Sequence, residues 1–201
     1  MTFRKITLLV MALAVLVSGC GREDLFELPH TPLHLISFIE MPSSCDGITS
    51  MGNYAYVAGG EAGLEVLDIS DPANPALVGT FATDAHGVTL SADGGTAYVA
   101  SVDSGLQIID IRDPANLQLL GSFDTSGEAH DVVLSADGDT AYIADAGSGL
   151  QIIDVRDPAN PLLQGSFDTS GRAYDVALST DGSVVYVADN NSGLQVIDIR
   201  D

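Results

Sequence analysis

The sequence predicts an all-β fold built from repeated blades of four antiparallel strands, and three observations lead to this prediction. A motif beginning Gly-Leu and ending in Asp recurs with its glycines at 63, 105, 149 and 193. The spacings of 42, 44 and 44 residues are typical of an array of one supersecondary unit. Between the motifs lie apolar, β-branched runs of strand length, separated by turn residues. No stretch after Val17 shows helical periodicity, which excludes helical repeats of similar period.

The strands are clearest around the third motif. Four runs of strand composition lie there, at 149–155, 161–167, 173–179 and 184–188. Asp157-Pro158 sets a proline at a turn, and Asp181-Gly182 supplies the positive φ of a tight hairpin. Because the same punctuation recurs at 93–94 and 137–138, we expect every unit to be a four-stranded meander. The predicted blades span approximately 35–69, 76–111, 117–155 and 161–199.

Four-stranded units of this period are the blades of a β-propeller. The runs GLQIIDIRDPAN, GLQIIDVRDPANP and GLQVIDIRD are similar to the LVIVD repeat, a propeller-forming motif of bacterial surface and secreted proteins. The segments AHDVVLSADG and YDVALSTDG resemble the inner strands of related surface-layer propellers. The resemblance covers nearly all of 35–201 and implies a propeller in the cell envelope. It lends no catalytic residue.

The blade count leaves two architectures open. Propellers of the family the chain resembles usually hold more than four blades, and the last motif lacks the Pro-Ala-Asn that follows the other three. We therefore expect a fragment of a longer propeller, with a closed four-bladed ring as the alternative. In an incomplete ring the apolar sides of the first and last blades are exposed. Isolated residues 35–201 are then expected to form dimers or larger assemblies.

The first twenty residues have the pattern of an export signal. Arg4 and Lys5 precede an apolar run from Ile6 to Val17, as in a secretory signal peptide, and the run is too short for a membrane span. Its end, Leu-Val-Ser-Gly-Cys20, resembles the lipobox of bacterial lipoproteins. The resemblance implies cleavage after residue 19 and acylation of Cys20, with 20–34 as a linker. We expect a lipid-anchored protein of the bacterial envelope, at the outer membrane or cell surface rather than in the cytoplasm.

Charge narrows the class of partner. The chain carries 28 acidic and 7 basic residues, a formal net charge of −21. Removing residues 1–19 removes Arg4 and Lys5 and no acid, so the mature charge is −23 and no lysine remains. Such a surface excludes phosphate binding and therefore nucleic acid, whereas cations and basic partners are compatible with it. With Cys20 acylated, Cys45 is the only thiol left and no internal disulfide forms.

The best candidate site lies where the innermost strands begin, at the rim of the central channel. Aligning the copies brings four residues to equivalent positions, and acids follow two of them: Asp46, His86, His130, Tyr174, Asp131 and Asp175. Imidazole and carboxylate together suit a divalent transition metal. The alternative is structural, because polar side chains at an inner edge also bond to the neighbouring blade. The sequence shows no cofactor motif.

Acidic loops give a second candidate, a calcium site at Asp103, Asp145 and Asp189. Calcium takes oxygen ligands from Asp, Asn and backbone carbonyls. The spacing matches no EF-hand, and Asp in a turn also bonds to its own backbone. The alternative is therefore a structural turn residue.

Three repeated residue types are predicted to be structural. The motif aspartates are expected to cap the following turn, and the arginines two positions later to pair with the adjacent acids at 113, 157 and 201. The tyrosines at 56, 98, 142 and 186 are expected to pack within and between blades.

Three classes of function remain open on the sequence alone. The sequence favours a non-enzymatic surface lipoprotein that binds a protein, peptide or glycan through its propeller. No nucleophile elbow, HExxH motif or phosphate loop is present. The alternatives are a propeller domain of a hydrolase, lyase or oxidoreductase with a channel-face site, and a spacer for a missing C-terminal domain.

Overall fold

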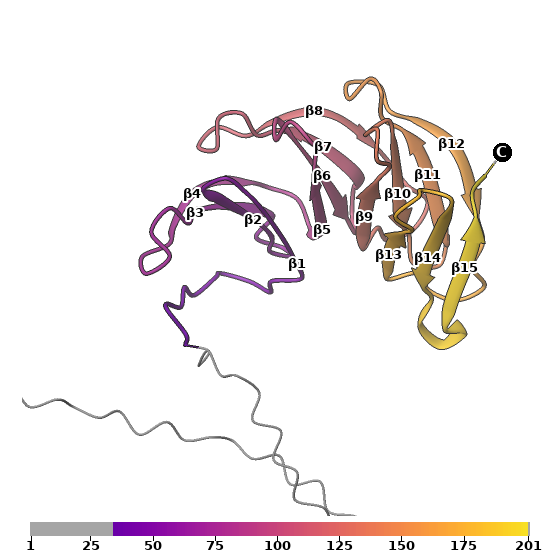
Figure 1. The fold of residues 1–201 in the computed structure, drawn as a ribbon, viewed down its shortest axis with the longest axis horizontal. Helices are drawn as coiled ribbons and strands as arrows, with labels where there is room; N and C mark the ends of the chain where they lie inside the picture. Colours follow the sequence, from indigo (N-terminus) through magenta and orange to yellow (C-terminus); the bar gives the residue numbers. More distant parts are fainter. Residues whose placement is uncertain (1–33, 201) are drawn as a thin grey trace, which may run out of the picture. The chain divides into compact units, whose positions relative to one another are not determined.

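Four antiparallel sheets succeed one another along the chain in the computed structural model, which describes residues 34–200 (Figure 1). In every sheet the strands pair in chain order, as expected for a meander. The first three sheets have four strands and the last has three. The all-β prediction is confirmed, and the part that contains the sheets forms one compact unit beginning at Leu35.

The strands have these bounds. The first sheet contains β1 (Gly47–Met51), β2 (Tyr54–Ala58), β3 (Leu64–Asp68) and β4 (Ala76–Phe81). The second contains β5 (Ala85–Leu90), β6 (Thr96–Ser101), β7 (Gly105–Asp110) and β8 (Gln118–Phe123). The third contains β9 (Asp131–Leu134), β10 (Thr140–Ala144), β11 (Leu150–Asp154) and β12 (Leu162–Phe167). The fourth contains β13 (Asp175–Leu178), β14 (Val184–Ala188) and β15 (Leu194–Asp198), with a short 3₁₀ helix, η1 (Asn190–Ser192), before β15.

The predicted blade boundaries are shifted by one strand. The prediction began each unit at the strand after the Asp-Pro-Ala-Asn turn, but that strand closes the preceding sheet, as β4, β8 and β12 do. Residues 35–39, predicted as the first strand of the first blade, form no strand. The shift arises because the loops between sheets are as short as loops within a sheet, for example between β4 and β5, so the sequence alone does not mark where one sheet ends.

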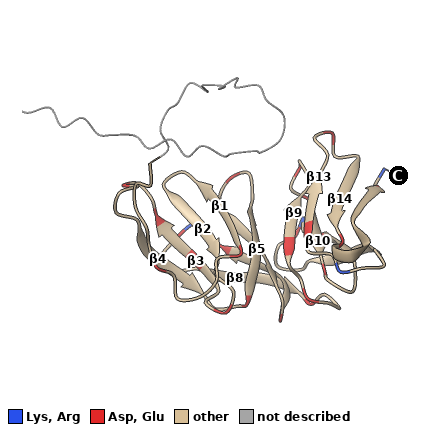
Figure 2. Ribbon diagram, turned by 90° about the horizontal axis from the view of Figure 1, so that it is seen from below, with Lys and Arg blue, Asp and Glu red and all other residues tan. Residues whose placement is uncertain are grey.

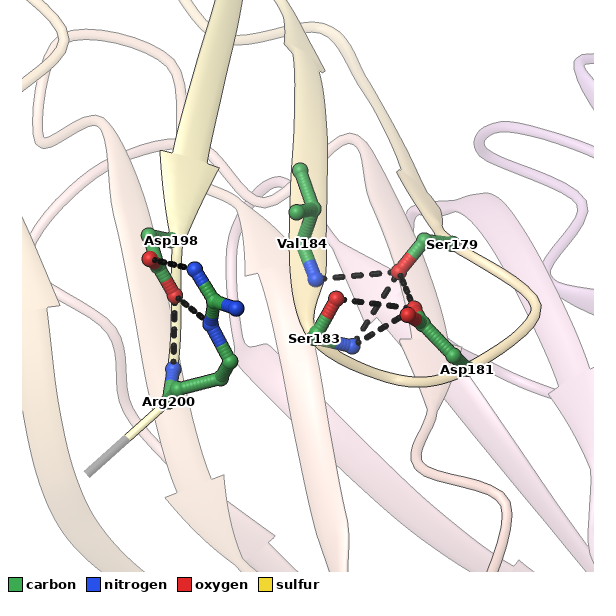
Figure 3. Close-up of polar contacts among 6 residues, drawn as sticks. All are labelled: Ser179, Asp181, Ser183, Val184, Asp198 and Arg200. Carbon is green, nitrogen blue, oxygen red and sulfur yellow. Dashed lines mark hydrogen bonds and ion pairs between the residues drawn. The ribbon is translucent and has the colours of Figure 1, made fainter.

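The hairpin between the first two strands of a sheet is held by a side-chain network. Ser179 Oγ donates to Asp181 Oδ1 at 2.6 Å, and that oxygen also accepts from the backbone N–H of Ser183 at 3.1 Å (Figure 3). Gly182 has φ +69°, the left-handed conformation that the sequence predicted. The second and third sheets repeat this geometry at Ser91 and Ser135. The turn is therefore specified locally.

The core lies between neighbouring sheets. Sheets that follow one another along the chain pack through their apolar sides, and the first strands β1, β5, β9 and β13 contact one another in that order. Between the second and third sheets, Tyr98, Leu106 and Ile108 pack against Val132 and Ile153. All five are buried, and the burial of such side chains is the main stabilising contribution.

The outer side of the fourth sheet has no such cover. Leu194 and Val196 are 64% and 62% exposed, whereas Leu106 and Ile108 at the equivalent positions of the second sheet are fully buried. The predicted packing role of the four tyrosines is confirmed at 56, 98 and 142 and is wrong at Tyr186, which is 37% exposed.

The predicted signal peptide, acylated Cys20 and most of the 20–34 linker lie outside the described residues. Within residues 34–200, no helix is both long enough and apolar enough to cross a membrane.

Candidate functional site

Three aromatic side chains from three consecutive sheets form a row. His86 belongs to β5, while His130 and Tyr174 immediately precede β9 and β13. The ring centroids of His86 and His130 are 5.2 Å apart, and those of His130 and Tyr174 are 4.7 Å apart, both edge to face. Edge-to-face contact is the favoured geometry for such rings. We call these three residues the aromatic row.

Backbone pairing explains the alignment. The N–H groups of Asp46, His130 and Tyr174 each donate to the carbonyl of the last residue of the second strand, all at 2.9 Å. A fully buried alanine precedes each ring, at Ala85, Ala129 and Ala173. The shared backbone bond and the enclosed alanine fix the chain on either side of this point, so the next side chain lies at an equivalent place in each sheet. The predicted convergence of Asp46, His86, His130 and Tyr174 therefore has a backbone cause.

Carboxylates flank the first ring. His86 Nδ1 lies 3.3 Å from Asp46 Oδ2, and His86 Nε2 lies 3.5 Å from Asp84 Oδ1. A protonated His86 interacts favourably with both acids. This end of the row is therefore suited to positive charge.

The middle ring is more enclosed. His130 Nε2 is buried, accepts or donates no hydrogen bond within residues 34–200, and lies 3.9 Å from Glu128 Oε2. Burial, followed by the proximity of His86, lowers the pKa of His130. The lowered pKa favours the neutral imidazole, and Nε2 is a buried polar atom without a hydrogen bond among residues 34–200.

Arg172 joins the middle and last parts of the row. Its guanidinium pairs with Glu128 and lies 5.9 Å from the ring centroid of Tyr174, within cation–π range. Because Glu128 is already paired, the uncompensated acids lie at the other end of the row, beside His86.

Asp131 and Asp175 come directly after two of the rings and begin β9 and β13. Asp131 Oδ2 accepts from the Val176 N–H at 3.1 Å. Burial is the largest cause that raises the pKa of Asp131 to about 6, and Asp175 adds to it. This carboxylate ties two sheets together, which is the structural role that the sequence left open.

Sequence reasoning overlooked Asp84, Glu128 and Arg172 as members of this site. A simple signal marks them, because each stands two positions before its ring residue, across the buried alanine. Strand alternation places residues two apart on the same side, so an alignment extended by two positions finds them.

The structure does not group the candidate metal ligands into a site among the described residues. Among residues 34–200, no three His, Cys, Asp or Glu side chains are grouped to hold a metal ion. Asp145 accepts from Thr125 Oγ1 at 2.7 Å and Asp189 from Thr169 Oγ1 at 2.7 Å, and both carboxylates are fully buried. Asp103 instead lines an open hollow of about 410 Å³ beside Asp84. A divalent metal and calcium stay predictions from the sequence.

The repeated motif aspartates cap the following turn, as predicted, but the motif arginines do not pair with the predicted acids. Oδ1 of the aspartate accepts the N–H two residues later, at 2.8–3.0 Å, in every copy: Asp68, Asp110, Asp154 and Asp198. Arg112, Arg156 and Arg200 pair with this same aspartate rather than with the acid that follows them. The tight turn directs the arginine back over its own strand end, as Figure 3 shows for Arg200.

Acidic side chains greatly outnumber basic ones among the described residues. Asp and Glu are distributed over the sheets and loops, while the basic residues are the four arginines 112, 156, 172 and 200 (Figure 2). Three of these are held in the motif pairs. The aromatic row therefore sits in a negative field.

A family model described as the LVIVD repeat matches four segments, 44–83, 84–125, 126–169 and 170–201. The matched segments start at the first strand of each sheet and so coincide with the observed sheets, not with the predicted blades. No curated protein matches the chain.

Solved structures similar to the chain include β-propellers. A functionally unknown protein from Desulfotomaculum acetoxidans matches at 20% identity with a TM-score of 0.67, over 80% of this chain and 56% of that one. The Cps50 (Swd1) β-propeller domain of Myceliophteria thermophila matches at 16% identity with a TM-score of 0.57, over 73% and 56%. Periplasmic gluconolactonase of Pseudomonas aeruginosa matches at 18% identity with a TM-score of 0.57, over 74% and 53%. The chain spans about half the length of these structures.

Proposed function

The chain belongs to the LVIVD repeat family and has a β-propeller fold, and from this premise we propose a cell-envelope lipoprotein that binds a basic segment of a partner protein along the aromatic row. It acts as a binding module without catalysis. The single observation that carries the proposal is the aromatic row, in which consecutive sheets each contribute one ring and one flanking charged residue.

The chemistry of the row supports a basic ligand. Asp46 and Asp84 flank His86, and neither has an arginine partner within residues 34–200. Ring faces and carboxylates together bind guanidinium and ammonium groups. The high net negative charge accelerates the approach of a basic partner.

The row also lacks the contacts of an activated nucleophile. Within the described part of the chain, the polar neighbours of His86 and His130 are carboxylates, and no hydroxyl or thiol hydrogen-bonds to either imidazole. Nucleophilic catalysis requires such a pair. This favours binding over hydrolysis.

Binding is tested with the full chain purified from membranes in detergent. The probe is a fluorescent peptide array of Arg/Lys-containing decamers, read by polarisation. We expect Asp84→Asn and His130→Ala to weaken the best peptide at least tenfold. His34→Ala and Asp113→Asn, which change an exposed histidine and an exposed acid outside the row, are expected to change it less than twofold. Equal losses in all four variants contradict a specific site, and selection of neutral peptides contradicts the basic class.

The lipid anchor is tested separately. Cells expressing the chain are fed alkyne-palmitate, and the purified protein is examined for label. We expect label on the wild type and on Cys45→Ala, and none on Cys20→Ala. Label that persists in Cys20→Ala contradicts the anchor and leaves the binding proposal unaffected.

A further inference from the structure

A hollow of about 380 Å³ lies between the first and second sheets, and we call it the tyrosine hollow. Its residues come from the hairpin between β1 and β2, the hairpin between β5 and β6, and the segment that follows β7. β1 begins next to Asp46 and ends at Met51, so the hollow lies at the opposite end of this strand from the aromatic row. Its volume is within the range of about 300–1,000 Å³ that is usual for small-ligand pockets.

Two tyrosines of β2 line the hollow. Tyr54 and Tyr56 are two residues apart on one strand, so their side chains lie on the same side of the sheet. Both pack against the core between the first and second sheets. Tyr56 is buried, whereas Tyr54 is half-buried and presents more of its ring to the hollow. Tyr54 is therefore the aromatic surface that a ligand contacts first.

Tyr54 distinguishes the first sheet from the other three. The position of Tyr56 holds a tyrosine in every sheet. The residue two positions earlier pairs with the motif aspartate across the strands, and Tyr54 is the first of these residues. In the other sheets this position holds a smaller side chain: Thr96, Thr140 and Val184. Packing within the repeat therefore does not require an aromatic ring at this position.

The first hairpin is also shorter than its counterparts. Residues 52–53 join β1 to β2, whereas longer loops join the first two strands of the other sheets, at 91–95, 135–139 and 179–183. The short loop contains neither the serine nor the aspartate of the hairpin network. Met51 packs against the second hairpin instead, because a Cβ at Gly94 would lie 2.3 Å from Met51 Sδ. The short hairpin thus leaves space beside Tyr54, and Met51 bounds that space.

The second sheet supplies one acceptor and one donor to the hollow. A Cβ at Gly95 would lie 3.5 Å from both Asp93 Oδ1 and Arg112 Cγ, so these two side chains flank the glycine. Asp93 Oδ1 accepts from Ser91 Oγ and from the Gly95 N–H, which leaves Oδ2 as an acceptor. Arg112 pairs with Asp110 through Nε and Nη2, which leaves Nη1 as a donor. Both side chains line the hollow with a polar atom to spare.

These charges select a neutral ligand. Hydrogen bonds from Ser91 and then Gly95, with a smaller contribution from Arg112, hold the pKa of Asp93 below its ordinary value, so the carboxylate is ionised at pH 7. Asp93 disfavours an anion and Arg112 disfavours a cation. A neutral ring with several hydroxyls suits both residues, because each hydroxyl donates and accepts. The CH groups of such a ring form an apolar face that covers an aromatic side chain.

We propose that the tyrosine hollow binds a neutral pyranose residue of a glycan. One face of the sugar ring lies on Tyr54, and its hydroxyls bond to Asp93 Oδ2 and Arg112 Nη1. Asn53, exposed in the short hairpin, offers a further polar contact. The site is assembled from two sheets that follow one another along the chain, and it shares no residue with the aromatic row.

The test is glycan binding by the full chain, purified in a detergent without a sugar headgroup. The probe is an array of neutral and acidic glycans presented multivalently, so that weak single-site binding is detected. The strongest glycan is then titrated as a fluorescent conjugate and read by polarisation. We expect saturable binding of a neutral glycan and competition by its free terminal monosaccharide. Tyr54→Thr, which introduces the residue of the second and third sheets, is expected to weaken binding about tenfold, and Tyr54→Phe less than about threefold.

A second pair of variants locates the site without changing the core. Asp93 is exposed, and Asp93→Asn keeps an Oδ1 acceptor for Ser91, so the hairpin should tolerate it. We expect it to weaken glycan binding about fivefold. Asp137→Asn is the matched control, because Asp137 makes the same hairpin bond with Ser135 in the third sheet but lies outside the hollow. It should change binding less than about twofold, and urea unfolding confirms that each variant is folded.

Three outcomes overturn the proposal. The first is no saturable binding of any neutral glycan, or selection of acidic glycans alone. The second is a free monosaccharide that does not compete, which excludes a single sugar ring as the ligand. The third is an equal loss in Asp93→Asn and Asp137→Asn, which places the glycan outside the hollow. Tyr54→Thr is expected to leave the binding of basic peptides unchanged within about twofold, so failure here leaves the proposed function intact.

Discussion

The second and fourth sheets are similar in sequence, yet equivalent side chains are buried in the second sheet and exposed in the fourth. Leu106 and Leu194 occupy the same register position, opposite Tyr98-containing and Tyr186-containing strands, and their exposures are 0% and 64%. Within the described residues, Leu106 has both a covering sheet and the neighbouring strand β8, and Leu194 has neither. Burial in a repeat protein is therefore a property of the neighbour as much as of the repeat.

Local geometry is insensitive to this difference. The Ser–Asp hairpin bond measures 2.6 Å in the second, third and fourth sheets alike. The motif aspartate likewise accepts its backbone N–H at 3.0 Å in Asp110, Asp154 and Asp198. Turns are thus fixed within a repeat, whereas stability accumulates between repeats.

Replacing the equivalent leucine by alanine in each sheet tests this comparison most directly. We expect Leu106→Ala to lower the free energy of unfolding by about 2–5 kcal/mol through lost burial and a cavity. Leu194→Ala should cost less than about 0.5 kcal/mol at low protein concentration. Urea denaturation measures both. A cost at Leu194 as large as the cost at Leu106 contradicts the comparison.

Asp131 and Asp175 occupy equivalent positions at the start of the first strand in the third and fourth sheets, and the titration of Asp131 depends on its burial. The raised folded-state pKa of Asp131, about 6, means that the folded protein holds this proton more tightly than the unfolded chain. Its contribution is therefore fully present below about pH 3.8 and is lost as pH rises through about 6. We expect Asp131→Asn, which keeps an acceptor for Val176, to be more stable than the wild type by about 1–3 kcal/mol at pH 8.

The measurement is urea unfolding from pH 4 to pH 8. The difference between Asp131→Asn and the wild type should grow across that range. Asp113→Asn serves as the control, because Asp113 is an exposed acid outside the aromatic row, and its difference from the wild type should be smaller. A difference independent of pH contradicts the assigned titration.

Glu65 offers a smaller test, in the first sheet. It is fully enclosed, its Oε2 has no hydrogen bond within residues 34–200, and burial raises its pKa. The second and third sheets have glutamine there, and Gln107 Nε2 donates to the Ser104 carbonyl at 2.8 Å. We expect Glu65→Gln to add about 0.5–1.5 kcal/mol at pH 7. The gain should shrink toward pH 4, where the wild-type carboxyl is protonated; thermal unfolding at the two pH values decides.

Much of the fold was readable from the sequence because its signals are local. The motif period, Asp181-Gly182 and the β-branched runs each determine structure within a few residues. The grouping of strands into sheets was not readable, because β4 and β5 belong to different sheets although they are joined by a loop as short as a hairpin. The exposure of Tyr186 could not be predicted from the sequence either, since it depends on whether another sheet covers the fourth.

The candidate site was predicted in part for the same reason. Alignment placed Asp46, His86, His130 and Tyr174 together, since equivalent backbone positions converge at the first strands. It did not give the pairing of Arg172 with Glu128, which lie 44 residues apart in neighbouring repeats. Nor did it give the direction of Arg156, because a turn of two residues decides whether the side chain meets the acid before or after it.

Breaking the Arg156–Asp154 contact is expected to change stability least of all, and it tests whether the turn geometry is determined within one repeat. The guanidinium of Arg156 is largely exposed, and its hydrogen bonds hold the pKa of Asp154 down to about 2. Solvent and salt screen such an exposed pair, so Arg156→Gln should leave the unfolding midpoint unchanged within error. The folded-state pKa of Asp154, measured by NMR titration, should rise because the charged partner is lost, and Arg200→Gln should raise that of Asp198 in the same way. Equal shifts in a covered sheet and an uncovered one indicate that the turn is independent of its neighbours, whereas a shift in only one sheet contradicts that independence.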